Sequence, residues 1–213
     1  MILAVDVISD VICPWCYIGK RRLEKAIAGL EGEHEVRVRW LAFQLNPTMP
    51  QNGIGRKEYR IKKFGSRERS LELDAKMVAV GEIEGIHFAF DRMERTPNTV
   101  DAHRLIWLAE QHGCQDAVVE AVFRAYFTEG RDISNRQTLI DVVAEAGLER
   151  QLAEALLTSD EGTDAIKEAE GLSRRYRVDG VPFFIINNEI TLAGAQQPDT
   201  FLDAFRQAVG GNG

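Results

Sequence analysis

The stretch that decides the fold is Ile2-Leu3-Ala4-Val5-Asp6-Val7-Ile8, with Cys13-Pro14-Trp15-Cys16 following after a short connection, residues 9–12. The first run is short, apolar and rich in β-branched residues, which is typical of a buried strand. Beyond the cysteines, apolar residues recur at intervals of three and four, at Ile18, Leu23, Ala26, Ile27 and Leu30. This period indicates an amphipathic helix. Its solvent-exposed face is expected to carry Lys20, Arg21, Arg22, Glu24 and Lys25. The two cysteines therefore lie at a strand-to-helix junction.

The position of the motif in this junction gives the two thiols different expected roles. Pro14 suits the first position of a helix, because its missing N–H would have had no intrahelical partner there, and Cys13 then occupies the N-cap. Cys13 would face unpaired N–H groups and the positive end of the helix dipole, which favour thiolate over thiol. Cys16 falls about one turn on and deeper, as a resolving thiol requires. We predict a redox-active pair.

The longer string DVICPWCYIGKRRLEKA, residues 10–26, resembles the DsbA-like branch of the thioredoxin superfamily. The likeness is greatest to the group that holds FrnE-type oxidoreductases and 2-hydroxychromene-2-carboxylate isomerases. Two simpler interpretations are a zinc half-site and an inert buried pair. A structural zinc site normally takes four Cys or His ligands, and only His112 and Cys114 offer further suggestive spacing. The redox interpretation is favoured because both the strand before the motif and the helix after it are present.

The rest of the chain predicts a fold that is interrupted by helices. Residues Glu35–Phe43 alternate like a strand, which completes a βαβ unit with parallel strands and a right-handed crossover. From Arg56 to Ser173 the pattern is helical, with Ser134 and Ser159 as expected N-caps. Strand patterns return in a hairpin over residues 181–193, turning at Asn187-Asn188, before a last helix over 198–209.

This order, βαβ, helices, ββα, predicts an α/β thioredoxin fold with a large all-helical insertion, and the DsbA-like resemblance implies the same architecture. We assign residues 1–45 and 177–213 to a thioredoxin-like domain and residues 46–176 to the helical insertion domain. The insertion is expected to form a lid over one side of the core.

The composition and charge of the chain limit the classes of binding partner that we expect. The 213 residues are 45% hydrophobic, enough for a full core, and carry a net charge of −7, which argues against nucleic acid as the main partner. No apolar stretch approaches the length that spans a bilayer, and the first residues lack the pattern of a signal peptide, so we expect a cytoplasmic protein and no membrane association. In the cytoplasm a CxxC pair is more often catalytic than structural. A monomer and a homodimer are both compatible with the sequence.

Further residues are assigned by the resemblance. In thioredoxin-like proteins the proline matching Pro182 is cis and faces the CxxC motif, which would let the N–H and C=O of Val181 pair with an extended substrate. The alternative is a trans proline that only begins a strand. Residues 96–112 resemble a segment that borders the active site, so Asn98 and His103 are candidates, although a plain helix cap and a half-buried histidine are favoured for them. Trp15 and Pro14 would form an apolar lip beside Cys13.

The leading functional hypothesis is a protein or peptide disulfide reductase or isomerase that works through a mixed disulfide. It needs no cofactor or metal beyond the Cys13/Cys16 pair, and a thiol reductant such as glutathione or the thioredoxin system would supply electrons. A runner-up is a glutathione-dependent isomerase or transferase acting on an aromatic or polyketide-like molecule, but related isomerases typically carry serine where Cys13 stands. A non-enzymatic module that holds a client protein is a third hypothesis. Cys114 is expected to be a quiet spare thiol.

Overall fold

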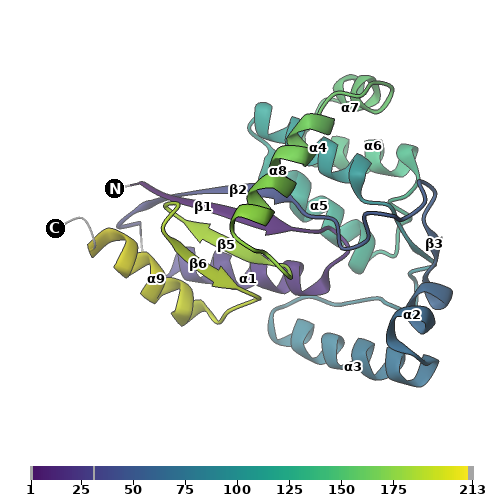
Figure 1. The fold of residues 1–213 in the computed structure, drawn as a ribbon, viewed down its shortest axis with the longest axis horizontal. Coiled ribbons are helices and arrows are strands. Elements are labelled where there is room, and N and C mark those ends of the chain that lie inside the picture. Colours follow the sequence, from purple (N-terminus) through teal and green to yellow (C-terminus); the bar gives the residue numbers. More distant parts are fainter. Residues whose placement is uncertain (1, 31, 211–213) are drawn as a thin grey trace.

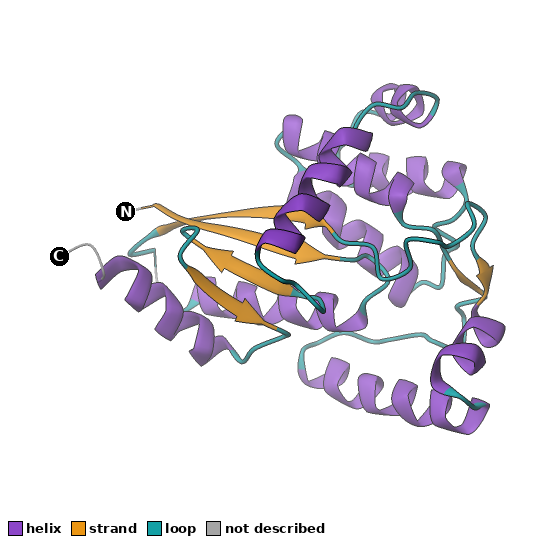
Figure 2. Cartoon of the chain, in the orientation of Figure 1, coloured by secondary structure: helices purple, strands orange, loops and turns teal. Residues whose placement is uncertain are grey.

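The computed structural model describes residues 2–30 and 32–210. Its main sheet has the strand order β2-β1-β5-β6 (Figure 2). The four strands are β1 (Ile2–Ser9), β2 (Glu35–Ala42), β5 (Phe183–Ile186) and β6 (Ile190–Ala193). β1 and β2 run parallel, from the pair Ile2/Glu35 to the pair Ser9/Ala42, and β5 runs antiparallel to both β1 and β6. The two ends of the chain thus share one sheet, and the predicted βαβ and ββα units are confirmed.

Helices cover this sheet and position the motif. Helix α1 (Pro14–Ala28) packs against α9 (Pro198–Gly210), and Phe201 of α9 lies edge-on to Phe184 of β5 with ring centroids 4.7 Å apart. Helix α8 (Thr163–Arg175) packs against β2 and lies in front of the sheet in Figure 1. Because α1 begins just after the C-terminal end of β1, the motif lies at the end of the sheet that faces the insertion.

The segment between β2 and β5 is helical, as predicted. Its helices before α8 are α2 (Arg56–Phe64), α3 (Arg67–Ile83), α4 (Val100–Gln111), α5 (Gln115–Phe127), α6 (Arg136–Glu145) and α7 (Arg150–Leu157). They do not form a lid over one side: α3 contacts α1, whereas α4, α5 and α8 contact β2, and the two groups lie apart in Figure 1. A short antiparallel pair, β3 (Ile54–Gly55) and β4 (Arg95–Thr96), also occurs here. Strands of two residues are too short to show a period in the sequence.

The two expected serine caps are wrong. Asn135 caps α6, since its side chain accepts a hydrogen bond from the Thr138 N–H at 3.1 Å, while the Ser134 N–H and hydroxyl both donate to Asp132. The N-cap of α8 is Gly162 and not Ser159. Its φ of 79° is a conformation that glycine adopts at little energetic cost. Asparagine is as good a cap as serine, so the sequence alone does not choose between neighbours.

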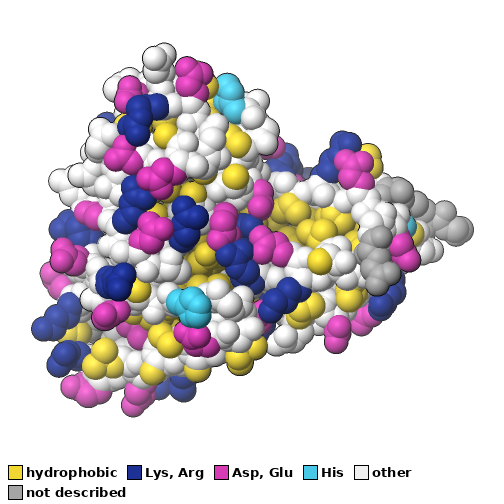
Figure 3. Space-filling model, turned by 180° about the vertical axis from the view of Figure 1, so that it is seen from behind, with side chains coloured by type: hydrophobic (Ala, Val, Ile, Leu, Met, Phe, Trp, Pro, Cys, Tyr) yellow, Lys and Arg dark blue, Asp and Glu magenta, His cyan; other side chains and the backbone are white. Residues whose placement is uncertain are grey.

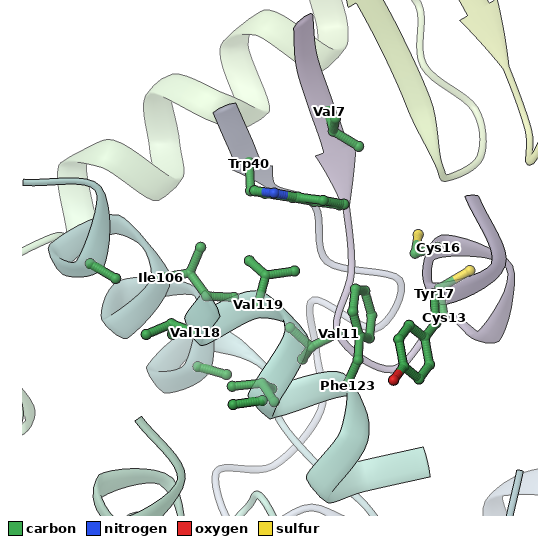
Figure 4. Packing of buried hydrophobic residues seen from close by; sticks show 14 of the residues in the cluster. Val7, Val11, Cys13, Cys16, Tyr17, Trp40, Ile106, Val118, Val119 and Phe123 are labelled. Carbon is green, nitrogen blue, oxygen red and sulfur yellow. The ribbon is translucent and has the colours of Figure 1, made fainter. Parts of the chain in front are cut away.

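An aromatic cluster joins α1 to the insertion. Tyr17, one residue after the motif, stacks on Phe123 of α5 with centroids 5.0 Å apart, and Trp40 of β2 meets the same ring edge-on at 6.4 Å. Figure 4 shows Tyr17, Trp40 and Phe123, and Phe127 and Phe88 extend the cluster through their own contacts with Tyr17. Phe123 and Phe127 are almost completely buried. The core is therefore continuous from the sheet into the helices of the insertion.

The prediction that the polar side of α1 is exposed to solvent is partly wrong, because ion pairs bury part of this side against α5 and the end of α3. The Lys20 side chain is only 2% exposed and its ammonium pairs with Glu24, with Asp116 at 3.0 Å and with Glu120 at 3.5 Å. Arg22 is also buried, and its Nε donates to Glu84 at 2.6 Å. The helical period places both residues on the polar face, but it cannot show that another helix covers that face.

Charge is mixed on the surface. On the face shown in Figure 3, basic and acidic side chains are interspersed, with apolar side chains between them, so this face offers no extended positive area to a phosphate backbone. Within residues 2–30 and 32–210, no helix combines the length and the apolar character that crossing a bilayer requires.

Candidate active site

Cys13 caps α1, as its spacing from Pro14 predicts. Its φ of −93° and ψ of 111° are extended, and Pro14 takes the first position of the helix. The Cys13 N–H donates to the Asp10 carbonyl at 3.0 Å, and the Cys16 N–H donates to the Cys13 carbonyl at 3.0 Å. A tight turn thus leads from β1 into the helix, and the Cys13 thiol stands at the positive end of the helix dipole.

The structure brings Cys13 together with Val181 and Pro182, which lie far from it in the sequence. The Cys13 Sγ donates a hydrogen bond to the Val181 carbonyl oxygen, with a separation of 3.4 Å. The peptide bond between Val181 and Pro182 is cis, and β5 begins at the next residue. The carbonyl that the resemblance assigns to substrate capture is therefore next to the candidate nucleophile.

Cys16 is the more enclosed of the two thiols. It is 0% exposed, compared with 6% for Cys13, and both residues lie at the start of α1 (Figure 4). Burial is the largest cause that raises the pKa of Cys16 well above its usual value, and the adjacent Cys13 raises it further. The Ser9 hydroxyl and the Asp10 backbone N–H act in the opposite direction but do not cancel this effect. Cys16 therefore stays protonated near neutral pH, as a resolving thiol should.

We predict that a small alkylating agent modifies Cys13 before Cys16. Iodoacetamide should be added in limiting amounts to the protein, reduced in advance, near pH 7, and the products mapped by peptide mass spectrometry. Cys13 should carry nearly all the early label because Cys16 has no exposed surface and a raised pKa. Cys114 is partly exposed and serves as an internal reference, although burial also raises its pKa. Equal labelling of Cys13 and Cys16 would contradict the assigned roles.

A pocket of about 340 Å³ opens beside the motif, and Cys13, Pro14 and Trp15 form one of its walls. The other walls come from α2, α3, α5 and the loops around them, and include Tyr59, Phe64, Met77, Phe90, Met93, Tyr126 and Phe127. Trp15 is 43% exposed, so a large apolar surface lies at the pocket and is open to solvent. A ligand beside Cys13 would thus meet mainly aromatic and apolar side chains.

Positive charge accompanies these aromatic walls. Arg56 and Arg60 line the pocket and both pair with Asp74, at 2.9 Å and 2.6 Å. The Arg60 guanidinium also lies 4.4 Å from the centroid of the Phe64 ring. The sequence placed these residues on helices but could not show that they face Cys13, because no period reveals how two helices pack on a third element.

Asn98 and His103 lie outside this pocket. Asn98 joins two segments, since its Nδ2 donates to the Met49 carbonyl at 2.7 Å and its Oδ1 accepts from the Val100 N–H at 3.0 Å, while Thr99 occupies the N-cap of α4. His103 is buried, not half-buried as expected, and its Nε2 contacts the Phe43 carbonyl at 3.0 Å. Neither side chain touches Cys13.

Gly19 is a site residue that the sequence analysis missed. A Cβ atom at this position would lie 2.9 Å from Pro182 Cγ and 3.1 Å from Phe184 Cζ. The absence of a side chain therefore lets α1 approach the segment that carries Val181 and Pro182. A glycine inside an otherwise regular helix is the signal that could have pointed to this close contact.

We predict that Gly19→Ala destabilises the protein although alanine is the better helix former. The gain in helix propensity is about 1 kcal/mol, whereas overpacking in a filled core costs about 1–3 kcal/mol. Gly171→Ala in α8 is the matched control, because its Cβ would meet only one atom, Arg174 Nη2 at 3.9 Å. Urea unfolding should place the midpoint of Gly19→Ala below that of the wild type and that of Gly171→Ala above it. If the midpoint of Gly19→Ala equals that of the control, Pro182 and Phe184 can move away from the added methyl group at no cost in stability, and the prediction is wrong.

Comparison with known proteins agrees with this site and fold. The model of the DSBA-like thioredoxin domain matches residues 4–206. A probable DsbA oxidoreductase from Streptomyces coelicolor is 29% identical, with a TM-score of 0.89 over 99% of this chain and 92% of that one. The cytosolic disulfide reductase DsbM from Pseudomonas aeruginosa, solved with GSH, is 20% identical, with a TM-score of 0.67 over 97% of this chain and 98% of that one.

A 2-hydroxychromene-2-carboxylate isomerase is also similar, with 20% identity and a TM-score of 0.70 over 98% of this chain and 97% of that one. At this level of identity the likeness establishes a shared fold. The match to the domain model covers nearly the whole chain, including the CxxC motif and the segment around Val181 and Pro182. The chain therefore belongs to the family of DSBA-like thioredoxin domains.

Proposed function

We propose that this protein is a thiol-disulfide oxidoreductase that reduces or isomerises disulfides in proteins or peptides. One observation carries the proposal: Cys13 Sγ, at the N-terminus of α1, lies 3.4 Å from the Val181 carbonyl oxygen, with Cys16 buried behind it. An attacking thiol, a strand-like backbone site for a peptide and a protected resolving thiol are then in one place.

The reaction follows from this arrangement. The Cys13 thiolate attacks one sulfur of the substrate disulfide, and the other sulfur leaves as a thiolate that takes up a proton. The substrate chain next to the new mixed disulfide pairs with the backbone of Val181. Cys16 then attacks Cys13 Sγ, releases the second substrate thiol and forms the Cys13–Cys16 disulfide. Two electrons have passed from the protein to the substrate, and an external thiol must return them.

We infer that the net direction is reductive and that the protein works in the cytoplasm. Secretory-pathway oxidants of the DsbA type have a histidine between the cysteines that stabilises the thiolate, whereas this chain has Trp15 after Pro14. A less stabilised thiolate makes the disulfide less oxidising. Glutathione or the thioredoxin system would regenerate the dithiol, and DsbM, a cytosolic disulfide reductase solved with GSH, has the same fold.

The pocket beside Cys13 favours a second candidate function. Its volume of about 340 Å³ lies in the range of small-molecule sites, and its walls are mainly apolar. This would suit a glutathione-dependent isomerase or transferase acting on an aromatic compound. Cys13 stands where related isomerases typically have serine, so we place this candidate second.

The test is turnover of disulfides of different size by the wild-type protein. Reduction of insulin by dithiothreitol and by glutathione should be measured with and without the protein, alongside reduction of glutathione disulfide. We expect acceleration with insulin, and a mixed disulfide on Cys13 detectable by mass spectrometry after acid quenching. No acceleration and no adduct on Cys13 with either substrate would overturn the proposal.

A further inference from the structure

A buried acid and histidine pair lies beneath the motif, and the reaction described above does not use it. Asp10 is 0% exposed and His103 is 4% exposed, and Asp10 Oδ1 lies 3.3 Å from His103 Nε2. The other carboxylate oxygen accepts from the Leu45 N–H at 2.8 Å, and the Asp10 carbonyl accepts from the Cys13 N–H. Asp10 thus links His103 to the turn that precedes Cys13, through its side chain and its backbone carbonyl.

The contacts of His103 fix which ring nitrogen can act as a base. The Phe43 carbonyl, 3.0 Å from Nε2, can only accept a hydrogen bond, so Nε2 carries the proton in the neutral ring. Nδ1 then has a free lone pair. Over residues 2–30 and 32–210, Nδ1 makes no hydrogen bond, yet it is not one of the fully enclosed unpaired atoms, which are His34 Nδ1 and Asn46 Nδ2. It therefore borders space that a small molecule can enter.

A small void lies between this histidine and Ser9, the last residue of β1. It has a volume of about 10 Å³ and is lined by Ser9 and His103 and by the apolar side chains around them. This is close to the smallest volume that holds one water molecule. The Ser9 hydroxyl lowers the pKa of the Cys16 thiol, which makes Ser9 the link from the void to Cys16. His103 also lines a larger open pocket of about 390 Å³ between β2, α4 and α8, which gives a proton a route to solvent.

Burial creates the need for such a route. Cys16 has no exposed surface, and a substrate joined to Cys13 would cover the motif further. The thiolate is the form that attacks a disulfide, so Cys16 must lose its proton where bulk water does not reach. Asp10 is a carboxylate in contact with the ring and would stabilise a charged imidazole. The other charged side chains around the larger pocket are Arg39, Glu110 and Glu168, and Arg39 is paired with Asp6.

We propose that His103, held by Asp10, accepts the proton of Cys16 through the Ser9 hydroxyl and one water molecule when Cys16 resolves the mixed disulfide; this rests on the proposed oxidoreductase function. The bond between Cys16 sulfur and hydrogen breaks, and the proton passes to Nδ1. The Cys16 thiolate forms a bond to Cys13 Sγ while the bond from Cys13 to the substrate sulfur breaks. The departing thiolate takes a proton from solvent, and the imidazolium returns its proton to solvent through the larger pocket.

The test separates the two chemical steps in single turnovers. A peptide disulfide is mixed with excess protein whose cysteines are reduced, samples are quenched with acid, and the mixed disulfide is followed by mass spectrometry. With His103→Gln, the first step should keep its rate while the resolving step slows by about 10²-fold, the usual scale for a lost proton acceptor. The mixed disulfide should then accumulate. His112→Gln, an exposed histidine at the end of α4, should behave like the wild type.

The pH profile distinguishes proton transfer from a structural role. In His103→Gln the resolving rate should rise about tenfold per pH unit, because only thiolate formed by hydroxide reacts, whereas the wild-type rate should depend less steeply on pH. Ser9→Ala is the second variant, since it interrupts the route without touching the pair, and it should also slow the resolving step alone. If His103→Gln does not fold, the resolving rate of Ser9→Ala alone tests the proton route.

The results that would overturn the proton route differ from those that would overturn the proposed oxidoreductase function. A wild type that forms no mixed disulfide would defeat the oxidoreductase function itself. In another outcome the wild type turns over while Ser9→Ala, and His103→Gln if it folds, resolve the mixed disulfide at the wild-type rate and with the wild-type pH profile. That result would overturn only the proton route. An equal loss in both chemical steps would also overturn it, because it would indicate a structural role for the pair.

Discussion

Replacing Phe123 by alanine should lower the free energy of unfolding by about 3–5 kcal/mol, the scale for removing a buried aromatic ring. The ring is 0% exposed and contacts Tyr17 of α1, Trp40 of β2 and Phe127 of its own helix. Its loss opens a cavity between the sheet and the insertion, and close-packed neighbours refill such a cavity only in part. Because Tyr17 follows Cys16 directly, the N-terminal turn of α1 should also lose support.

Urea unfolding measures this effect, with the midpoint converted through the slope of the transition. Phe64→Ala is the matched control, because Phe64 on α2 is only partly buried and its ring lies under the Arg60 guanidinium. We expect it to cost clearly less than Phe123→Ala. Equal and small losses for both variants would mean that the aromatic cluster does not join the insertion to the core. A lower slope for Phe123→Ala alone would indicate that the two parts unfold separately.

The elements of the fold could be predicted from the sequence because each carries its own period. The sequence shows a buried strand at residues 2–8, a change to a helical period after Cys16 and a return of strand patterns after residue 180. These patterns define the order of the elements along the chain. The packing between elements could not be predicted in this way. Lys20 is predicted to be exposed to solvent because lysine usually is, and only the packing of α5 shows that Asp116 and Glu120 join Glu24 around its ammonium group.

The same limit separates the predicted parts of the site from the missed ones. Cys13 and Cys16 form a short motif whose chemistry depends on spacing along the chain, and Val181 and Pro182 are assigned by the resemblance to thioredoxin-like proteins. The pocket beside Cys13, the close contact at Gly19 and the pair of Asp10 with His103 depend on elements that meet only in three dimensions. His103 was weighed as a candidate, but nothing in the sequence names its partner, which lies 93 residues earlier.

The cysteine variants should show the largest effect on activity. Cys13→Ser should reduce disulfide turnover by at least about 10³-fold, the scale on which the loss of a nucleophile acts, since a serine hydroxyl cannot exchange with a disulfide. Cys16→Ser should keep the first step, because Cys13 retains the N-cap and its contact with the Val181 carbonyl. Without the resolving thiol, the substrate should stay attached. Cys114→Ser, at the start of α5, is the matched control and should keep the wild-type rate.

Mass spectrometry of the intact protein distinguishes these outcomes after incubation with a peptide disulfide. Cys16→Ser should gain the mass of one peptide thiol, which dithiothreitol removes, and Cys13→Ser should gain none. An adduct on Cys16 in Cys13→Ser would reverse the two roles and would require the enclosed thiol to become accessible. Turnover that survives in Cys13→Ser at the wild-type rate would end the disulfide mechanism and favour the second candidate function, because the resemblance implies that isomerases of this group work with a serine at this position. The decision depends on the one sulfur atom that lies between the helix N-terminus and the Val181 carbonyl.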